Sequence, residues 1–274
     1  YIDATINGGG HALEVIKKVG PEGLVLGVDW DDGLIRNLKI EKEKLKITNL
    51  ELFCGNYVNL KTIAGQHNLS EVNGIIFDLG FSSEHLEKSG RGFSFQKDEP
   101  LDMRYNTLNN ELTAEKIINS WEAKTIETLL HEYGEERFAG RIARGILQAR
   151  RNKKITTTAE LVAVIRKSTP RYYLKARINP ATKTFQALRI AVNKELENLE
   201  KALPQAAELL KSEGKLAVIS FHSLEDRIVK NFFRQKKKEG YFKILNPKPI
   251  IASDEELRTN PRARSAKLRA AQRL

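Results

Sequence analysis

The sequence has one cysteine and no cluster of thiols and histidines from which a structural zinc site could be built. Cys54 therefore has no partner for an internal disulfide, which suits a reducing, cytoplasmic setting. It lies in the apolar stretch 50–54, where we expect a small buried side chain in a strand. The five histidines show no metal-ligand spacing, so we expect no bound metal.

Long apolar runs are also lacking, since none approaches the roughly 20 residues that a membrane-spanning helix needs. Residues 1–6 lack the basic start and long apolar stretch of a signal peptide, and they resemble a strand already under way. We therefore expect natural residues upstream of them. At 274 residues, one large domain or a core with an inserted domain fits better than two equal halves.

Acidic residues are missing from two long tracts, which concentrates the net charge of +11. Residues 161–194 contain no Asp or Glu but eight Lys and Arg, and residues 262–274 repeat the pattern. The first tract also contains Tyr172 and Tyr173, so it suits a polyanion with stackable bases better than an acidic membrane surface. The cations that we expect to contact RNA are Arg171, Lys175, Arg177, Arg262 and Arg264.

What is present in the first hundred residues is an alternation of β-rich runs, at 1–6, 23–30, 50–55 and 73–80, with helical stretches. The runs are nearly continuous in Val, Ile and Leu, as in strands that are covered on both faces. This order predicts an α/β fold with a mostly parallel, Rossmann-like sheet. Strand character returns at 215–221, before a helix over 227–236.

The middle of the chain is helical, with helices predicted over 113–120, 125–133, 135–151 and 158–167. Thr157 and Glu160 form a capping box at the start of the last one. A further helix begins near Lys183, and its apolar stripe continues to Leu203, where Pro204 should kink or interrupt it. We therefore expect a core domain at 1–104 and 183–274, with a helical insertion at 105–182 that carries much of the basic tract.

The chemistry centres on the glycine-rich loop 7–11, which follows the first strand and precedes a helix. Glycine lets a backbone approach a ligand closely, and Asp29 ends the second strand about 20 residues later, where an acid can accept hydrogen bonds from ribose hydroxyls. An adenosine-type ligand is therefore favoured. Because the loop departs from G-x-G-x-x-G, NAD suits it less well than a cofactor without a pyrophosphate.

Asp78 ends the fourth strand, at the edge of the sheet where open α/β folds bind ligands. The alternative for this residue is a turn or a helix cap. Position favours a functional role.

At this point eight ordered motifs resemble the bacterial RsmH family, also called MraW, over essentially the whole chain. The motifs lie at 3–11, 78–83, 91–95, 100–104, 134–137, 180–190, 220–227 and 260–265. The family's enzymes methylate N4 of a cytidine in the decoding region of 16S ribosomal RNA, within the small ribosomal subunit. The resemblance implies a class I methyltransferase core with an inserted helical domain, and S-adenosylmethionine as the cofactor. The family's short segment before the first strand is absent.

The resemblance also implies which residues contact the cofactor: Gly9, Gly10, His11, Asp29, Tyr57, Asp78 and His85. Among these, Asp29 holds the ribose, and Tyr57 stands where the family usually has Phe beside the adenine. His85 replaces a family Gln, and an imidazole can supply one amide hydrogen bond but not both.

Methyl transfer to a cytosine amino group needs acceptors for the amino hydrogens, because the nitrogen lone pair is delocalised into the ring. We expect Asp78 and the turn 79–83, which includes Ser82, to supply them. The second candidates are Ser220, His222 and Asp226. Two other classes stay open: a nucleotide-linked oxidoreductase, which leaves the basic tracts unexplained, and a non-catalytic RNA-binding factor, which leaves the loop and its acids idle.

Overall fold

A computed structural model of the protein describes residues 1–176 and 179–274, so Arg177 lies outside the described residues. The chain forms two compact units. The first unit comprises Tyr1–Gly80 and Leu196–Leu274, and the second comprises Phe81–Glu195.

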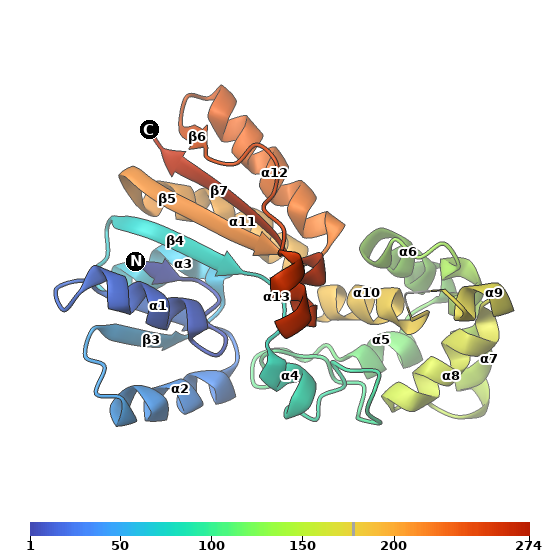
Figure 1. Ribbon diagram of the computed structural model, residues 1–274. Helices are drawn as coiled ribbons and strands as arrows, with labels where there is room; N and C mark the ends of the chain where they lie inside the picture. Colours follow the sequence, from blue (N-terminus) through green and yellow to red (C-terminus); the bar gives the residue numbers. More distant parts are fainter. Residues whose placement is uncertain (177–178) are drawn as a thin grey trace. The chain divides into compact units, whose positions relative to one another are not determined.

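The first unit is built on a sheet whose strand order is β3-β2-β1-β4-β5-β7-β6 (Figure 1). The strands are β1 (Ile2–Asp3), β2 (Val25–Asp29), β3 (Leu50–Cys54), β4 (Val72–Asp78), β5 (Leu210–Ser220), β6 (Phe242–Ile244) and β7 (Lys267–Arg273). Strands β1 to β5 are parallel, and β7 is antiparallel to both β5 and β6. The predicted α/β class is confirmed, but part of the basic tail is a strand of the sheet.

Helices cover both faces of this sheet. Alternate residues of β2 point to opposite faces: Val25 packs with residues of α1 (Gly10–Val19) and α2 (Asp32–Lys44), whereas Leu26 and Val28 belong to the core of the other face. That second core includes residues of α3 (Leu60–Gln66), α11 (Glu195–Leu209) and α12 (Ser223–Lys238). The unit also contains η1 (Tyr57–Asn59), α13 (Asp254–Thr259) and η2 (Pro261–Ser265).

The second unit is helical, as predicted for the middle of the chain. Its helices are α4 (Ser83–Glu87), α5 (Ala114–Ser120), α6 (Ala123–Gly134), α7 (Ala139–Asn152), α8 (Thr158–Ser168), α9 (Arg171–Leu174) and α10 (Ala181–Asn193). The insertion was predicted to begin after residue 104 and to end at residue 182, whereas the compact unit begins after residue 80 and ends at residue 195. Phe93, Leu101 and Met103, which precede the predicted insertion, are buried in the helical core, and so are residues of α10.

The long helix expected from Lys183 to Leu203 is two helices. Lys194 takes a left-handed conformation, with φ 52°, and ends α10, while Pro204 lies inside α11. The apolar stripe divides at the same point. Phe185 and Leu188 belong to the core of the second unit, and Leu203 belongs to the core of the first. The apolar periodicity continues across the break and does not reveal it, because each of the two helices buries one apolar face.

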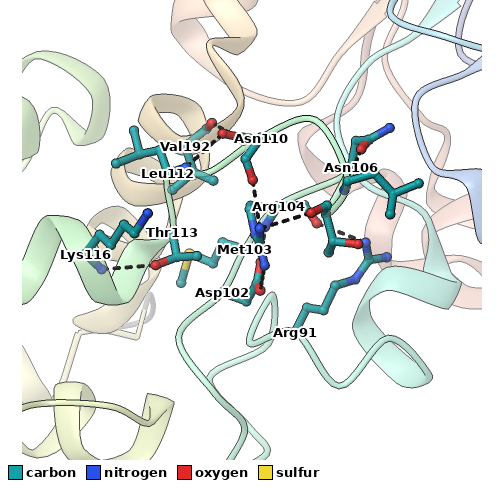
Figure 2. Close-up of polar contacts among 12 residues, drawn as sticks. Arg91, Asp102, Met103, Arg104, Asn106, Asn110, Leu112, Thr113, Lys116 and Val192 are labelled. Carbon is teal, nitrogen blue, oxygen red and sulfur yellow. Dashed lines mark hydrogen bonds and ion pairs between the residues drawn. The ribbon is translucent and has the colours of Figure 1, made fainter.

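A polar network holds the loop before α5 in the second unit (Figure 2). Arg104 pairs with Asp102 at 2.6 Å and also donates to the Asn110 carbonyl at 2.7 Å. The Asn110 amide in turn donates to the Val192 carbonyl at the end of α10. Met103, between the paired residues, has φ 62°, a conformation that a non-glycine residue adopts only when its surroundings fix it.

Cys54 corrects one expectation. It is exposed, because it is the last residue of β3 and lies where the chain leaves the sheet. Among the described residues, no helix is both long enough and apolar enough to span a bilayer.

Candidate active site

The glycine loop lies between the end of β1 and the first turn of α1. Gly9 has φ 79°, and its N–H donates to the Ile6 carbonyl at 2.7 Å, so the loop turns sharply before the helix begins at Gly10. A Cβ added at Gly8 or Gly10 would meet nothing within 4 Å. These two residues therefore border open space, and a ligand can approach their backbone beside the N-terminus of a helix, where N–H groups are unsatisfied.

Asn7 ties the glycine loop to two neighbouring strand ends. Its backbone N–H donates to Asp29 Oδ2 at 2.9 Å, and its side-chain amide donates to the carbonyls of Thr5 at 3.0 Å and Asp78 at 3.2 Å. Its φ of 48° is left-handed, which Asn tolerates better than most residues. No function of its own was predicted for Asn7 from the sequence. An Asn directly before a glycine run, where a turn is needed, was the available signal.

Asp29 lies at the carboxyl end of β2, beside the loop, as predicted. Its two oxygens accept backbone N–H groups, Oδ2 from Asn7 and Oδ1 from Asp31, each at 2.9 Å. A carboxylate has about four lone-pair sites, so Asp29 can accept more than these two bonds. Asp29 therefore shapes the loop in addition to any contact that it makes with a ligand.

Asp78 and His11 face each other across the same strand ends. His11 Nε2 lies 3.6 Å from Asp78 Oδ2, and the side chains are 49% and 25% exposed, respectively. The neighbouring Asp78 carboxylate raises the pKa of His11, and burial opposes that shift. The Asp78 backbone N–H donates to Thr5 Oγ1 at 2.5 Å, so the main chain of this strand end is fixed. The site thus presents a carboxylate beside an imidazole, and the carboxylate favours the protonated form of that imidazole.

Asp3 is a third carboxyl group in this region, and the sequence analysis did not single it out. It is 2% exposed at the end of β1, and one oxygen accepts the Thr5 N–H at 3.2 Å. The other oxygen, Oδ2, has no hydrogen-bond partner among the described residues. Burial raises the pKa of Asp3 to about 7, and the negative charges of Asp78 and Asp29 add to that shift. An acid within an apolar strand, directly before the glycine loop, was the signal in the sequence.

Tyr57 follows β3 and begins η1, for which Asn56 is the N-cap. Its ring meets Phe77 of β4 edge to face, with the ring centres 5.6 Å apart. Tyr57 is half-buried at the next strand end beyond Asp29. An aromatic side chain therefore stands on the carboxyl side of the sheet, and its contact with an adenine stays a prediction.

Ser82 and His85 belong to the second unit and form the capping box of α4. The Ser82 N–H donates to His85 Nδ1 at 3.0 Å, and the His85 N–H donates to Ser82 Oγ at 3.3 Å. The His85 ring is 3% exposed and packs against Phe93 and Tyr105, with ring centres 5.1 and 5.2 Å away. One imidazole nitrogen is thus committed to the cap. A cofactor contact by His85 and a catalytic function for Ser82 stay predictions.

The candidates at the end of β5 have structural partners in the first unit. His222, rather than Ser223, is the N-cap of α12, and its Nε2 lies 3.1 Å from Glu225 Oε1 without forming a hydrogen bond. Asp226 is paired with Arg269 of β7 at 2.6 Å, and Ser220 Oγ donates to the Lys267 carbonyl at 3.3 Å. These contacts join α12 and β5 to β7. They are the structural contacts expected of residues at the start of a helix, which is the alternative to a catalytic function.

The predicted RNA-contacting cations are exposed where the structure describes them: Arg171 in α9, Lys175 directly after it, and Arg262 and Arg264 in η2. Two other arginines of the acid-free tracts are buried. The sequence did not suggest this, because neither tract contains an acid. Arg189 pairs with Glu195, and Arg269 pairs with Asp226. The acids come from beyond each tract, so only part of the positive charge faces solvent.

The parallel strands β1 to β5 with antiparallel β7, together with the glycine loop and the acids at the strand ends, define a Rossmann-like class I methyltransferase. Comparison with known proteins narrows this class. Residues 1–274 match the MraW methylase family, and the chain belongs to that family.

Two curated relatives are both named ribosomal RNA small subunit methyltransferase H. The protein from Persephonella marina is 43% identical over 277 residues, and the one from Sulfurihydrogenibium azorense is 45% identical over 276. Each alignment covers 100% of this chain and 92% of the relative. A solved putative rRNA methylase from Clostridium thermocellum is 13% identical, with a TM-score of 0.46 over 100% of this chain and 87% of that one.

Proposed function

We propose that this protein transfers a methyl group from S-adenosylmethionine to N4 of a cytidine in the decoding region of 16S ribosomal RNA. The observation that carries the proposal is the full-length family match, combined with a glycine loop whose anchoring residue, Asn7, bonds to both Asp29 and Asp78. The names of the relatives support small-subunit ribosomal RNA as the substrate. The choice of base and atom rests on the resemblance described above.

The residues present suit this cofactor. Open space above Gly8 and Gly10 allows close approach to the backbone, and the surrounding acids Asp3, Asp29 and Asp78 suit a ligand that carries hydroxyls and positive charge. Gly9, Gly10 and His11 would contact the cofactor, Asp29 would hold its ribose, and Tyr57 would lie beside the adenine. When bound, S-adenosylmethionine supplies an electrophilic methyl group on a sulfonium.

Asp78 is the preferred acceptor for the hydrogens of the target amino group. Its main chain is held by Thr5 and Asn7, so the carboxylate projects from a fixed strand end and needs little reorganisation during the reaction. Hydrogen bonds from the amino group to this carboxylate would localise the nitrogen lone pair and offset the positive charge that develops there. Ser82 and His222 are weaker candidates, because their polar atoms cap helices.

Alignment of the amino nitrogen with the methyl group supplies the rest of the acceleration, because the transfer is a direct in-line displacement. The target base must leave its stack, which suits single-stranded or distorted RNA. We assign the RNA backbone to the exposed cations Arg171, Lys175, Arg262 and Arg264, and to Arg177, which lies outside the described residues. An enzyme with this substrate works in the cytoplasm.

Labelled methyl transfer to purified small ribosomal subunits tests the proposal. We expect label in the RNA, recovered as N4-methylcytidine after nuclease digestion. Titration with NAD provides the contrast, since binding of NAD without binding of S-adenosylmethionine would favour an oxidoreductase. RNA binding without any methyl transfer would favour the non-catalytic factor.

A further inference from the structure

A groove in the second unit lies between α7 and α8, and none of its lining residues is among those assigned to the methyl transfer. It has a volume of about 680 Å³, and it is lined along both helices and the connection between them. The two helices run antiparallel, because Gly145 of α7 packs against Ser168 at the end of α8 while Lys153 after α7 pairs with Glu160 at the start of α8. The groove therefore follows the length of the helix pair.

Positive charge dominates the lining. Arg141 and Arg144 come from α7, Lys153 and Lys154 from the connection, and Lys167 from α8. Glu160 is the one acid of the lining, and Lys153 neutralises it at 2.6 Å. The other four cations are exposed, and they form no ion pair with a residue that the structure describes. Cations brought to one concave surface without acids to neutralise them repel one another, so an anionic ligand would stabilise them.

The remaining lining residues suit a sugar–phosphate chain. Gln148, Asn152 and Ser168 offer amide and hydroxyl groups, and Ala149, Ala163 and Val164 give small apolar contacts. Gly145 keeps the helices close, since a Cβ there would lie 2.0 Å from Ser168 Oγ. Hydroxyl and amide partners beside cations are the combination that binds phosphates and 2′-hydroxyls of RNA.

An aromatic cluster lies on the segments that adjoin one end of this helix pair. Arg137 and Phe138 directly precede α7, and Tyr172 follows α8 by a short connection. The Arg137 guanidinium lies 4.6 Å from the Phe138 ring centre and donates to the Tyr172 hydroxyl at 2.6 Å. Tyr172 is 60% exposed, and the Arg137 guanidinium lies 5.5 Å from its ring centre, so the ring is held where an unstacked base could reach it.

We propose that the groove between α7 and α8 binds the sugar–phosphate backbone of RNA, next to a base-stacking position on Tyr172. The proposal rests on the proposed function for the identity of the polyanion. RNA is favoured over an anionic membrane because amide and hydroxyl groups line the groove beside the cations, and because an exposed aromatic ring lies on an adjoining segment. The groove would position a region of the substrate distinct from the base that is methylated.

The test is a charge-removing variant, Arg141→Gln/Arg144→Gln/Lys167→Gln, measured for binding to a small-subunit ribosomal RNA fragment across a salt series. We expect affinity to fall by about 10- to 100-fold near 0.15 M salt, with a slope of log affinity against log salt that is shallower by about 2, since each lost single-strand phosphate contact removes about 0.7. A matched control is Lys18→Gln/Lys39→Gln/Lys44→Gln, which removes the same charge from exposed positions of α1 and α2. The control should keep most of the wild-type affinity and slope.

Two further measurements make the outcome decisive. Affinity for S-adenosylmethionine should be unchanged in the groove variant, and Arg141→Lys/Arg144→Lys should recover most of the RNA affinity because the positive charge is retained. Groove and control variants with equal RNA affinities would overturn the proposal even if the wild type methylates RNA. Lost binding to phosphatidylserine vesicles with unchanged RNA binding would assign the groove to a membrane instead. Absence of methyl transfer by the wild type would contradict the proposed function and leave the RNA-binding result to stand alone.

Discussion

The two units of the molecule use charged groups in opposite ways. In the first unit, Asp3, Asp29 and Asp78 lie at the ends of neighbouring parallel strands, and backbone N–H groups and Asn7 hold them in place. In the second unit, the buried charges of Arg189 and Glu195 neutralise each other, while Arg141, Arg144 and Lys167 are exposed along a groove.

This difference separates two kinds of binding. Fixed acids at strand ends suit a small ligand with hydroxyls and a positive centre, and exposed cations on helices suit a long polyanion. Substitutions at the strand ends of the first unit should therefore change cofactor binding and chemistry, whereas substitutions of the groove cations in the second should change RNA binding and its salt dependence.

The largest effect is expected from Asp78→Ala. Removing a preorganised acceptor of this kind typically lowers kcat by about 100- to 1,000-fold. The affinity for RNA, measured by direct binding, should stay within about 2-fold of the wild type, because the RNA-binding cations are untouched. Asp78→Asn is the matched variant: it keeps an acceptor oxygen but loses the negative charge, so its kcat should fall between the two. Full methyl transfer by Asp78→Ala would remove Asp78 from the mechanism.

Arg189→Ala tests the buried charges of the second unit. It leaves Glu195 buried without its ion-pair partner, and losses of this kind cost about 3–5 kcal/mol of unfolding free energy. Urea unfolding followed by the fluorescence of Trp121, which packs on that core, should show the loss. If the two units are energetically separate, S-adenosylmethionine binding persists at urea concentrations that unfold the second unit. Simultaneous loss of both signals would contradict that separation.

Asp29→Ala should raise the Kd for S-adenosylmethionine by about 100-fold, through lost charge-assisted hydrogen bonds to the ribose and a loosened glycine loop. Asp29→Asn keeps acceptor capacity and should lose less. RNA affinity at fixed salt is the control and should be unchanged. Calorimetric titration gives both constants, and an unaltered cofactor Kd would exclude the ribose contact.

The smallest effect concerns pH. Burial holds the pKa of Asp3 at about 7, against an ordinary value of 3.8, so the folded protein keeps a proton that the unfolded chain releases between these values. Stability from this group is therefore present at pH 4 and is lost as pH rises through 7. Asp3→Asn carries no such proton, so its Tm relative to the wild type should rise by several degrees from pH 4 to pH 8. A pH-independent difference in Tm would contradict the assignment.

Much of the first unit could be predicted because its signals are local. Continuous Val and Ile runs marked β2 and β4, the glycine loop was expected after the first strand, and Asp29 was expected at the end of the second. The antiparallel strand β7 was missed, because its sequence reads as a basic tail and its position depends on pairing with β5, far away in the chain. The anchoring by Asn7 and the burial of Asp3 likewise arise from tertiary contacts.

In the second unit, the helices and the capping box of Thr157 and Glu160 were predictable, and the capping box is confirmed. The break at Lys194 was not, because nothing in the apolar spacing distinguishes a continuous helix from two successive ones. The basic tract did not show which cations face solvent. Arg189 is paired in the core, and the groove draws Arg141 and Arg144 from a helix outside that tract.

Nucleoside analysis of small-subunit ribosomal RNA, from cells with and without the gene for this protein, tests the central claim most directly. The account predicts N4-methylcytidine in the RNA of cells that have the protein, its loss on deletion, and its return with the wild-type gene but not with Asp78→Ala. Unchanged N4-methylcytidine after deletion, in cells without a second enzyme of this family, would contradict the account.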